Sequence, residues 1–155
     1  MAYIGETLQD FILKDQDNND FKSKELRGKR ILLSFHPLAF TGICASQMKS
    51  LEDNVETFKR LNTVPLGLSI DQPFSKAAWA KELGIKEVRL LADFWPHGEV
   101  AKTLGLFREK QGFSERANII VDEKGKIMFA KVYEIKDLPD INEIIQFLES
   151  PDNMS

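Results

Sequence analysis

The sequence contains very little cysteine and histidine. Cys44 is the single cysteine of 155 residues, and His36 and His97 are the only histidines. One cysteine excludes an internal disulfide and a C-x-x-C redox pair, and with two histidines it leaves no plausible cysteine-based zinc site. Cys44 must therefore act alone or with another molecule.

Long apolar runs and excess positive charge are also missing. No run approaches the roughly 18 apolar residues of a membrane span, and the N-terminal stretch MAYIGETLQDF lacks the basic and apolar regions of a secretory signal. The net charge of -3 argues against a nucleic-acid partner. We expect a cytoplasmic protein without a membrane or nucleic-acid partner. The basic cluster within residues 22–30 is interpreted as a solvated hairpin and loop.

The length and pattern of the chain predict one domain spanning residues 1–155, because 43% hydrophobic and 29% charged residues suit a packed globular core. Alternating strand and helix patterns followed by a hairpin predict an α/β thioredoxin-like fold, with a mixed central sheet flanked by helices and an N-terminal hairpin extension. The expected strands are 11–14, 20–22, 30–35, 64–70, 88–92, 117–122 and 126–132. The expected helices are 43–61, 71–83, 99–104 and one that begins at Asp137 with Pro139 in its first turn.

Cys44 falls in the first turn of the helix expected after Thr41-Gly42. Unpaired backbone N–H groups and the positive end of the helix dipole favour a thiolate there. The ordinary alternative for a lone cysteine is a small buried core residue.

The surroundings of Cys44 favour the reactive interpretation. Pro37, Thr41 and Cys44 form the pattern P-x-x-x-T-x-x-C, which resembles the active-site loop of the peroxiredoxins. The chain is most similar to the one-cysteine alkyl hydroperoxide reductase E type, in the blocks FHPLAFTGIC, ADFWPHG and RANIIVD. It departs from the family at Leu8-Gln9, where Ala-Pro is usual, and this departure affects the expected first turn and not the chemistry.

The resemblance implies a role for four residues. Cys44 is the peroxidatic cysteine, Thr41 supplies a hydroxyl to thiolate and peroxide, Pro37 shields the pocket, and Arg116 is the cation. A guanidinium has an independent physical reason to be there, because it stays charged and offers several donors in one plane. The alternatives that remain open are a helix N-cap for Thr41 and a strand-edge surface charge for Arg116.

Other residues have weaker assignments. Gln47 lies one turn from Cys44 and orients the loop and the arginine, or is an ordinary exposed helix residue. Ile43 is a supporting residue of the site. Phe40 and Trp95 are candidates for a subunit contact. Structural roles are expected for the two histidines and for Trp79.

The expected activity is a thiol-dependent peroxidase that reduces hydrogen peroxide and organic hydroperoxides through a cysteine sulfenic acid. The chain has no second cysteine, so the reductant is an external thiol or a thioredoxin-like or glutaredoxin-like protein. No metal, haem, flavin or other cofactor is required. The resemblance implies a homodimer or a higher homo-oligomer. The alternative function is a peroxide sensor or redox relay that uses the same cysteine.

Overall fold

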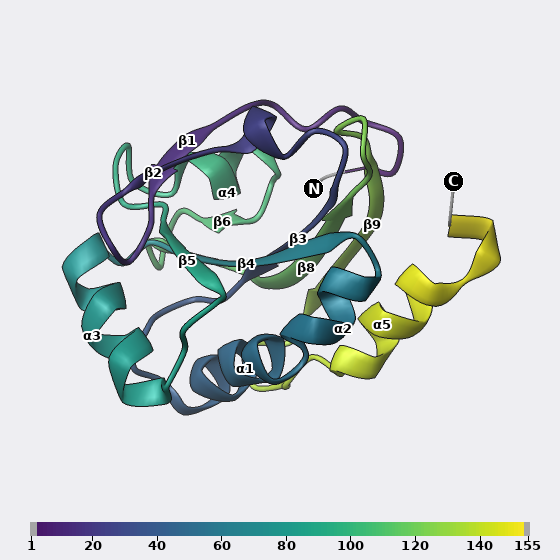
Figure 1. Cartoon of the computed structure of the whole chain (residues 1–155). Helices are drawn as coiled ribbons and strands as arrows, with labels where there is room; N and C mark the ends of the chain where they lie inside the picture. The colour runs from purple at the N-terminus through teal and green to yellow at the C-terminus, as the bar shows by residue number, and fades with distance from the viewer. Residues whose placement is uncertain (1–2, 154–155) are drawn as a thin grey trace.

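The computed structural model describes residues 3–153 and contains one seven-stranded mixed sheet (Figure 1). Its strand order is β2-β1-β5-β4-β3-β8-β9. Strands β3, β4 and β5 run parallel, whereas β8 pairs antiparallel with β3 and with β9. The bounds are β1 Ile12–Lys14, β2 Asp20–Lys22, β3 Arg30–Phe35, β4 Thr63–Ser69, β5 Arg89–Ala92, β8 Arg116–Val121 and β9 Ile127–Tyr133.

Helices cover both faces of this sheet. The buried apolar residues of α1 (Gly42–Asp53), α2 (Val55–Arg60), α3 (Pro73–Leu83) and α5 (Ile141–Glu149) belong to one hydrophobic cluster. The buried residues of α4 (Glu99–Thr103) belong to a second cluster, together with those of the N-terminal hairpin. Short 3-10 helices span Ser23–Leu26 and Pro151–Asn153. The sheet is therefore the middle layer, between α1, α2, α3 and α5 on one side and α4 on the other (Figure 1).

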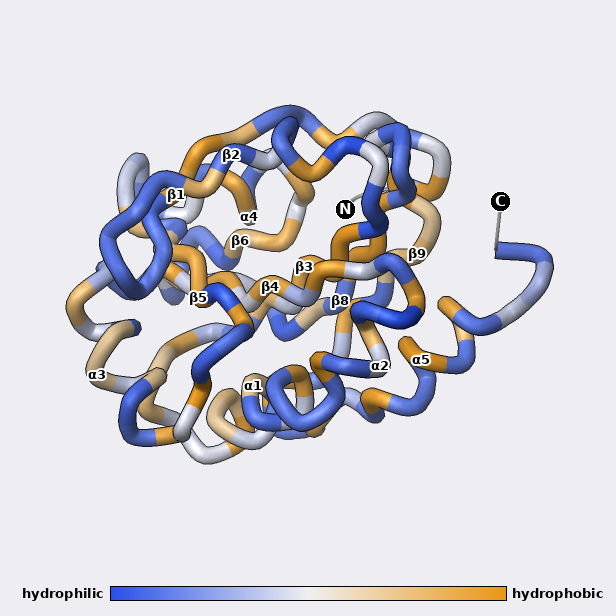
Figure 2. The backbone as a smooth tube through the Cα atoms, viewed as in Figure 1, coloured by the Kyte–Doolittle hydropathy of each residue, from blue (hydrophilic) through white to orange (hydrophobic). Residues whose placement is uncertain are grey.

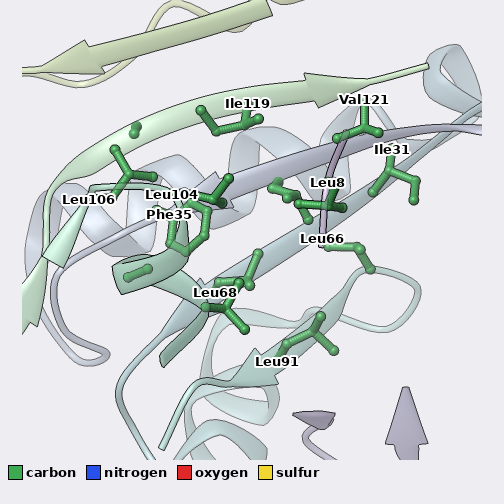
Figure 3. Packing of buried hydrophobic residues seen from close by; sticks show 14 of the residues in the cluster. Leu8, Ile31, Phe35, Leu66, Leu68, Leu91, Leu104, Leu106, Ile119 and Val121 are labelled. Atoms are coloured by element: carbon green, nitrogen blue, oxygen red, sulfur yellow. The ribbon is translucent and has the colours of Figure 1, made fainter. Parts of the chain in front are cut away.

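The central strands are apolar on both faces, as their continuous hydrophobic sequences predict. Ile31, Leu33 and Phe35 of β3 join the cluster under the N-terminal hairpin, and Leu32 joins the cluster under the helices. Figure 2 shows β3, β4 and β8 as largely hydrophobic segments at the centre of the chain. Figure 3 shows Leu66 and Leu68 of β4 packed with residues of the neighbouring strands. These strands form a rigid support for the loops at their ends.

The expected strands, including the N-terminal hairpin and the 117–132 hairpin, are confirmed within one or two residues. The departure at Leu8-Gln9 leaves the start of the chain attached to the sheet, because the N–H of Leu8 donates to the carbonyl of Gly125 and Thr7 bridges Lys126. Strands β6 (Phe107–Arg108) and β7 (Phe113–Ser114) form a small separate hairpin that was not expected.

Three helix boundaries were wrong. The single helix expected over 43–61 is divided at Asn54, whose side chain donates to the carbonyl of Ser50. The terminal helix begins at Ile141 and not at Asp137, because the carboxylate of Asp140 caps it by accepting from the N–H of Asn142. Pro139 therefore lies before the helix. Likewise, α3 begins at Pro73 with Gln72 as its N-cap, so Asp71 stays outside it.

The solvated interpretation of the basic cluster was wrong for Arg30. Its side chain is buried and donates to the carbonyls of Leu61, Leu148 and Asn153. The guanidinium thus joins the end of α2 to the C-terminal segment, because it satisfies carbonyls that helix ends leave free. The other four cations of the cluster are exposed, as expected.

Candidate active site

Cys44 is the third residue of α1, and its side chain is 1% exposed. Strand β3 ends at Phe35, and residues 36–41 then form the loop that leads into the helix. This strand-loop-helix order places the sulfur in the first turn of α1, as the sequence predicted. The N-terminus of a helix favours the thiolate form of a cysteine.

The sulfur belongs to the wall of a cavity of about 980 Å³. Its lining combines the loop before α1, the first turn of α1, the small β6-β7 hairpin and the segment after β9. The lining residues are Pro37, Leu38, Thr41, Gly42, Ile43, Cys44, Arg108, Phe113, Glu115, Arg116, Val132, Tyr133, Glu134, Ile135 and Lys136. Apolar side chains and both signs of charge therefore surround the sulfur.

Arg116 reaches Cys44 from the first position of β8. Its Nη1 donates to Sγ of Cys44 over 3.4 Å and to Oε1 of Gln47 over 2.7 Å, while its Nε donates to the carbonyl of Ile135 over 3.0 Å. The side chain is buried, so the structure rejects a strand-edge surface charge. The guanidinium thus makes three hydrogen bonds, and one of them is donated to the sulfur.

Gln47 is buried and fixed by polar partners. Besides accepting from Arg116, its amide donates to Oγ of Ser34 over 2.8 Å and to the carbonyl of Phe35 over 3.1 Å. Ser34 in turn donates to Asn118 on the neighbouring strand. Gln47 is therefore not an ordinary exposed helix residue, and its position allows it to orient Arg116.

Thr41 occupies the N-cap position of α1, but its side chain makes no capping hydrogen bond. Its Oγ1 instead donates to the carbonyl of Leu38 over 2.9 Å. Within residues 3–153 no hydrogen bond joins Thr41 to Cys44, although both line the cavity. The hydroxyl oxygen keeps its acceptor capacity toward the cavity. Pro37 is buried and Ile43 is half-buried in the same lining.

Comparisons with known proteins show the family of this chain. The AhpC/TSA family pattern matches residues 4–130. The chain belongs to this family. Alkyl hydroperoxide reductase E of Mycobacterium tuberculosis is 37% identical over 141 residues, covering 90% of this chain and 92% of that protein. Peroxiredoxin-1 of Gekko japonicus is 29% identical over 162 residues, covering 96% of this chain and 79% of that protein.

Solved structures show the same fold. The crystal structure of Enterococcus faecalis AhpC superposes with a TM-score of 0.89 at 24% identity, covering 96% of this chain and 92% of that one. The reduced 2-Cys peroxiredoxin of Plasmodium vivax gives a TM-score of 0.88 at 24% identity, covering 98% and 83%. The thioredoxin-like fold is thus confirmed. This AhpC/TSA member is a thiol-dependent peroxidase, and its single cysteine fits the one-cysteine type.

The histidines lie outside the Cys44 cavity lining. His36 is fully buried against Trp79, with ring centroids 5.3 Å apart, and both ring nitrogens lack a hydrogen-bond partner within residues 3–153. Burial lowers the pKa of His36 well below its usual range, and the charges of Lys76 and Arg116 lower it further. His97 hydrogen-bonds through Nε2 to the carbonyl of Gly112. Both observations agree with the structural roles expected from the sequence.

The candidate contact residues Phe40 and Trp95 are exposed by 55% and 79%, respectively. Phe74 and Phe94 are exposed aromatics as well. The part of the chain that the structure describes contains no cluster of three His, Cys, Asp or Glu side chains able to hold a metal ion. Within the same residues, no helix is long and apolar enough to cross a membrane.

Sequence reasoning missed a set of polar residues behind the loop, of which Lys76 and Ser69 are buried and Asp71 is half-buried. Lys76, Ser69 and Asp71 form hydrogen bonds that end on the backbone of Ala39. The signal available in the sequence was Lys76 itself, which lies three residues before the buried Trp79 and so faces inward with it.

Proposed function

We propose that this AhpC/TSA member reduces hydrogen peroxide and organic hydroperoxides with Cys44 as the peroxidatic residue. The observation that supports the proposal is the 3.4 Å hydrogen bond from Nη1 of the buried Arg116 to the sulfur of the single cysteine. A fixed guanidinium favours the thiolate and can donate to a peroxide oxygen. The thiolate attacks the terminal peroxide oxygen, so an S–O bond forms as the O–O bond breaks.

The leaving oxygen carries the charge that develops in this step. Arg116 and the N–H of Cys44 donate to it, the hydroxyl of Thr41 donates to it once it turns away from the carbonyl of Leu38, and protonation releases water or an alcohol. The sulfur has then lost two electrons and is a sulfenic acid. One molecule of an external thiol displaces water to form a mixed disulfide, and a second thiol releases Cys44 as a thiolate.

Pro37 shields the sulfur from solvent, and Ile43 supplies apolar contact to the substrate. Their support is that both line the Cys44 cavity from either end of the loop. Gln47 acts through Arg116 by fixing the direction of Nη1. Residues 1–155 form one peroxiredoxin domain in this proposal, of which residues 1–2 and 154–155 lie outside the described part.

Intact mass spectrometry tests the assignment of Cys44. One equivalent of hydrogen peroxide should add one oxygen to the protein, trapped as a dimedone adduct, and an excess without thiol should add two because no second cysteine captures the sulfenic acid. Without dimedone, dithiothreitol should restore the original mass of the singly oxidised protein, but not of the doubly oxidised one, and it should sustain steady peroxide consumption. Cys44→Ser is the matched control and should gain no oxygen at this position. An unmodified wild-type Cys44 peptide after excess peroxide contradicts the proposal.

The chain works in the cytoplasm as a homodimer or higher homo-oligomer, with a thioredoxin-like or glutaredoxin-like reductant. A free, buried cysteine suits a reducing compartment. The exposed rings of Phe40 and Trp95 are of the kind that protein interfaces bury. Sedimentation should show a dimer for the wild type and a monomer for a Phe40→Ser/Trp95→Ser double variant. A wild-type monomer at high micromolar concentration contradicts this contact.

A further inference from the structure

A chain of three hydrogen bonds lies behind the loop that precedes Cys44. Nζ of Lys76 donates to Oγ of Ser69 over 2.6 Å, and this hydroxyl donates to Oδ2 of Asp71 over 2.6 Å. The same carboxylate oxygen accepts the backbone N–H of Ala39 over 2.8 Å. Lys76 and Ser69 are buried. Helix α3 and the end of β4 are thereby connected to the loop before α1.

The loop that receives this support is under backbone strain. Ala39 lies between Pro37 and Thr41, and the next residue, Phe40, has a φ of 64°. A non-glycine residue in this left-handed region is strained and persists only where its surroundings hold it. The Asp71 carboxylate accepts a hydrogen bond from the N–H of Ala39, and the ring centroids of Phe40 and Trp79 lie 6.2 Å apart. The strained loop therefore depends on the region around α3.

Burying the ammonium of Lys76 at the end of this chain of hydrogen bonds costs desolvation free energy, so a functional reason for the lysine is needed. Burial lowers the pKa of Lys76 to about 8, against the attraction of Asp71, Asp93 and Cys44, which raises it. His36, the first residue after β3, is held neutral by burial, which lowers its pKa, and the charge of Lys76 lowers that pKa further. Lys76 is therefore protonated near neutral pH, and its charge interacts electrostatically with Cys44.

We propose that Lys76 is a positioning residue of the peroxidase site, whose buried ammonium holds the Pro37–Thr41 loop through Ser69 and Asp71. The inference rests on the proposed role of Cys44. Hydrogen bonds between charged groups are about twice as strong as neutral ones, so the protonated amine polarises Ser69 toward Asp71 and tightens the bond to Ala39. The ammonium also adds a second positive charge near the thiolate, independent of Arg116.

The role of the charge gives the site a specific pH dependence. As the pH rises through about 8, Lys76 loses its proton and the loop loses its charged support. His36 is already neutral over this range, because burial keeps its pKa well below the usual value. The benefit from Lys76 should therefore fade between neutral and alkaline pH.

Stopped-flow oxidation of Cys44 by hydrogen peroxide in Lys76→Met tests this positioning role. The side chain keeps its length and loses its charge, so the rate constant should fall about tenfold at pH 7. The wild-type rate constant divided by that of the variant should fall at least threefold between about pH 7 and 9.5, because the wild-type lysine deprotonates. Lys81→Met, which removes an exposed charge from the same helix, should behave as the wild type.

The outcomes separate this inference from the proposed function. A folded Lys76→Met variant with the wild-type rate, or a ratio that stays constant with pH, overturns the positioning role. If that variant does not fold, Ser69→Ala decides, because it keeps the lysine and breaks the chain; a wild-type rate in Ser69→Ala overturns the inference. A wild-type protein whose Cys44 does not react with peroxide refutes the proposed function instead.

Discussion

The amide oxygen of Gln47 accepts a 2.7 Å hydrogen bond from Nη1 of Arg116, the same nitrogen that donates to the sulfur of Cys44. Nη1 of Arg116 therefore connects the amide oxygen of Gln47 to the sulfur of Cys44. Since Gln47 is fixed in turn by Ser34 and the carbonyl of Phe35, the direction of the guanidinium is set by the end of β3. Precise placement of donors before reaction is what makes such electrostatic stabilisation effective.

Gln47→Met tests this placement. The variant keeps the side-chain volume but loses the acceptor for Arg116 and the donors to Ser34 and Phe35, so we expect the rate of Cys44 oxidation to fall about tenfold. Unfolding should become easier by about 1–3 kcal/mol, because buried partners lose their hydrogen bonds. Stopped-flow kinetics and urea unfolding measure the two effects. Gln146→Met, an exposed glutamine on α5, is the control. An unchanged oxidation rate would assign Gln47 a purely structural role.

Arg116→Lys separates geometry from charge. The planar guanidinium donates hydrogen bonds to Cys44, Gln47 and the carbonyl of Ile135 at once. A lysine ammonium on a flexible chain cannot reproduce this fixed arrangement of donors. We expect the peroxidation rate to fall at least tenfold, equivalent to about 1.4 kcal/mol of transition-state stabilisation. Stopped-flow oxidation of Cys44 measures this rate. Wild-type kinetics in the variant would show that positive charge alone is sufficient.

The sequence was sufficient for the sheet and for the position of Cys44, because both depend on local patterns. β3 and β8 are continuous apolar runs, and the turn before α1 follows from Pro37 and Gly42. The start of α5 was misplaced because two N-cap candidates, Asp137 and Asp140, stand three residues apart. Only the side-chain bond from Asp140 to the N–H of Asn142 decides between them.

Long-range polar contacts could not be derived in the same way. Arg30 looks like a surface cation in its sequence context, yet it is buried against carbonyls up to 123 residues away. Lys76 was overlooked for the same reason: its partners Ser69 and Asp71 approach it only when α3 packs against the end of β4. The spacing from Trp79 indicates that Lys76 faces inward, but it gives no sign of the polar partners that the buried ammonium will meet.

Thr41 supplies a test of whether a hydroxyl is needed in the cavity. Thr41→Ser keeps the oxygen and should retain most of the oxidation rate, whereas Thr41→Val keeps the shape and should lose ten- to a hundredfold, about 1.4 to 2.8 kcal/mol. Since Oγ1 bonds to Leu38 and does not cap α1, the Val variant should lose about 1 kcal/mol of stability through the loop. Stopped-flow kinetics beside urea unfolding distinguishes the effects. A Val variant that is less stable yet equally fast would remove Thr41 from the reaction.

Burial of Lys76 predicts a pH dependence of stability with a definite sign. Its pKa is about 8 in the folded protein and near the ordinary 10.5 when unfolded. Between these values the unfolded chain binds more protons, so the contribution of Lys76 to the free energy of unfolding rises with pH. Below about pH 8 the full cost of burying the ammonium remains. In Lys76→Met this titration is absent, while the other groups titrate nearly as before.

Urea unfolding of the wild type and Lys76→Met at pH 7, 8, 9 and 10 measures the difference directly. The wild-type free energy of unfolding should increase relative to that of the variant, starting near pH 8 and continuing toward pH 10. Lys81→Met controls for the loss of one charge from α3, and its difference from the wild type should stay flat, because that lysine is exposed. A flat difference for Lys76→Met would mean that the ammonium is solvated in the folded protein, and the charged support of the Pro37–Thr41 loop would then have no physical basis.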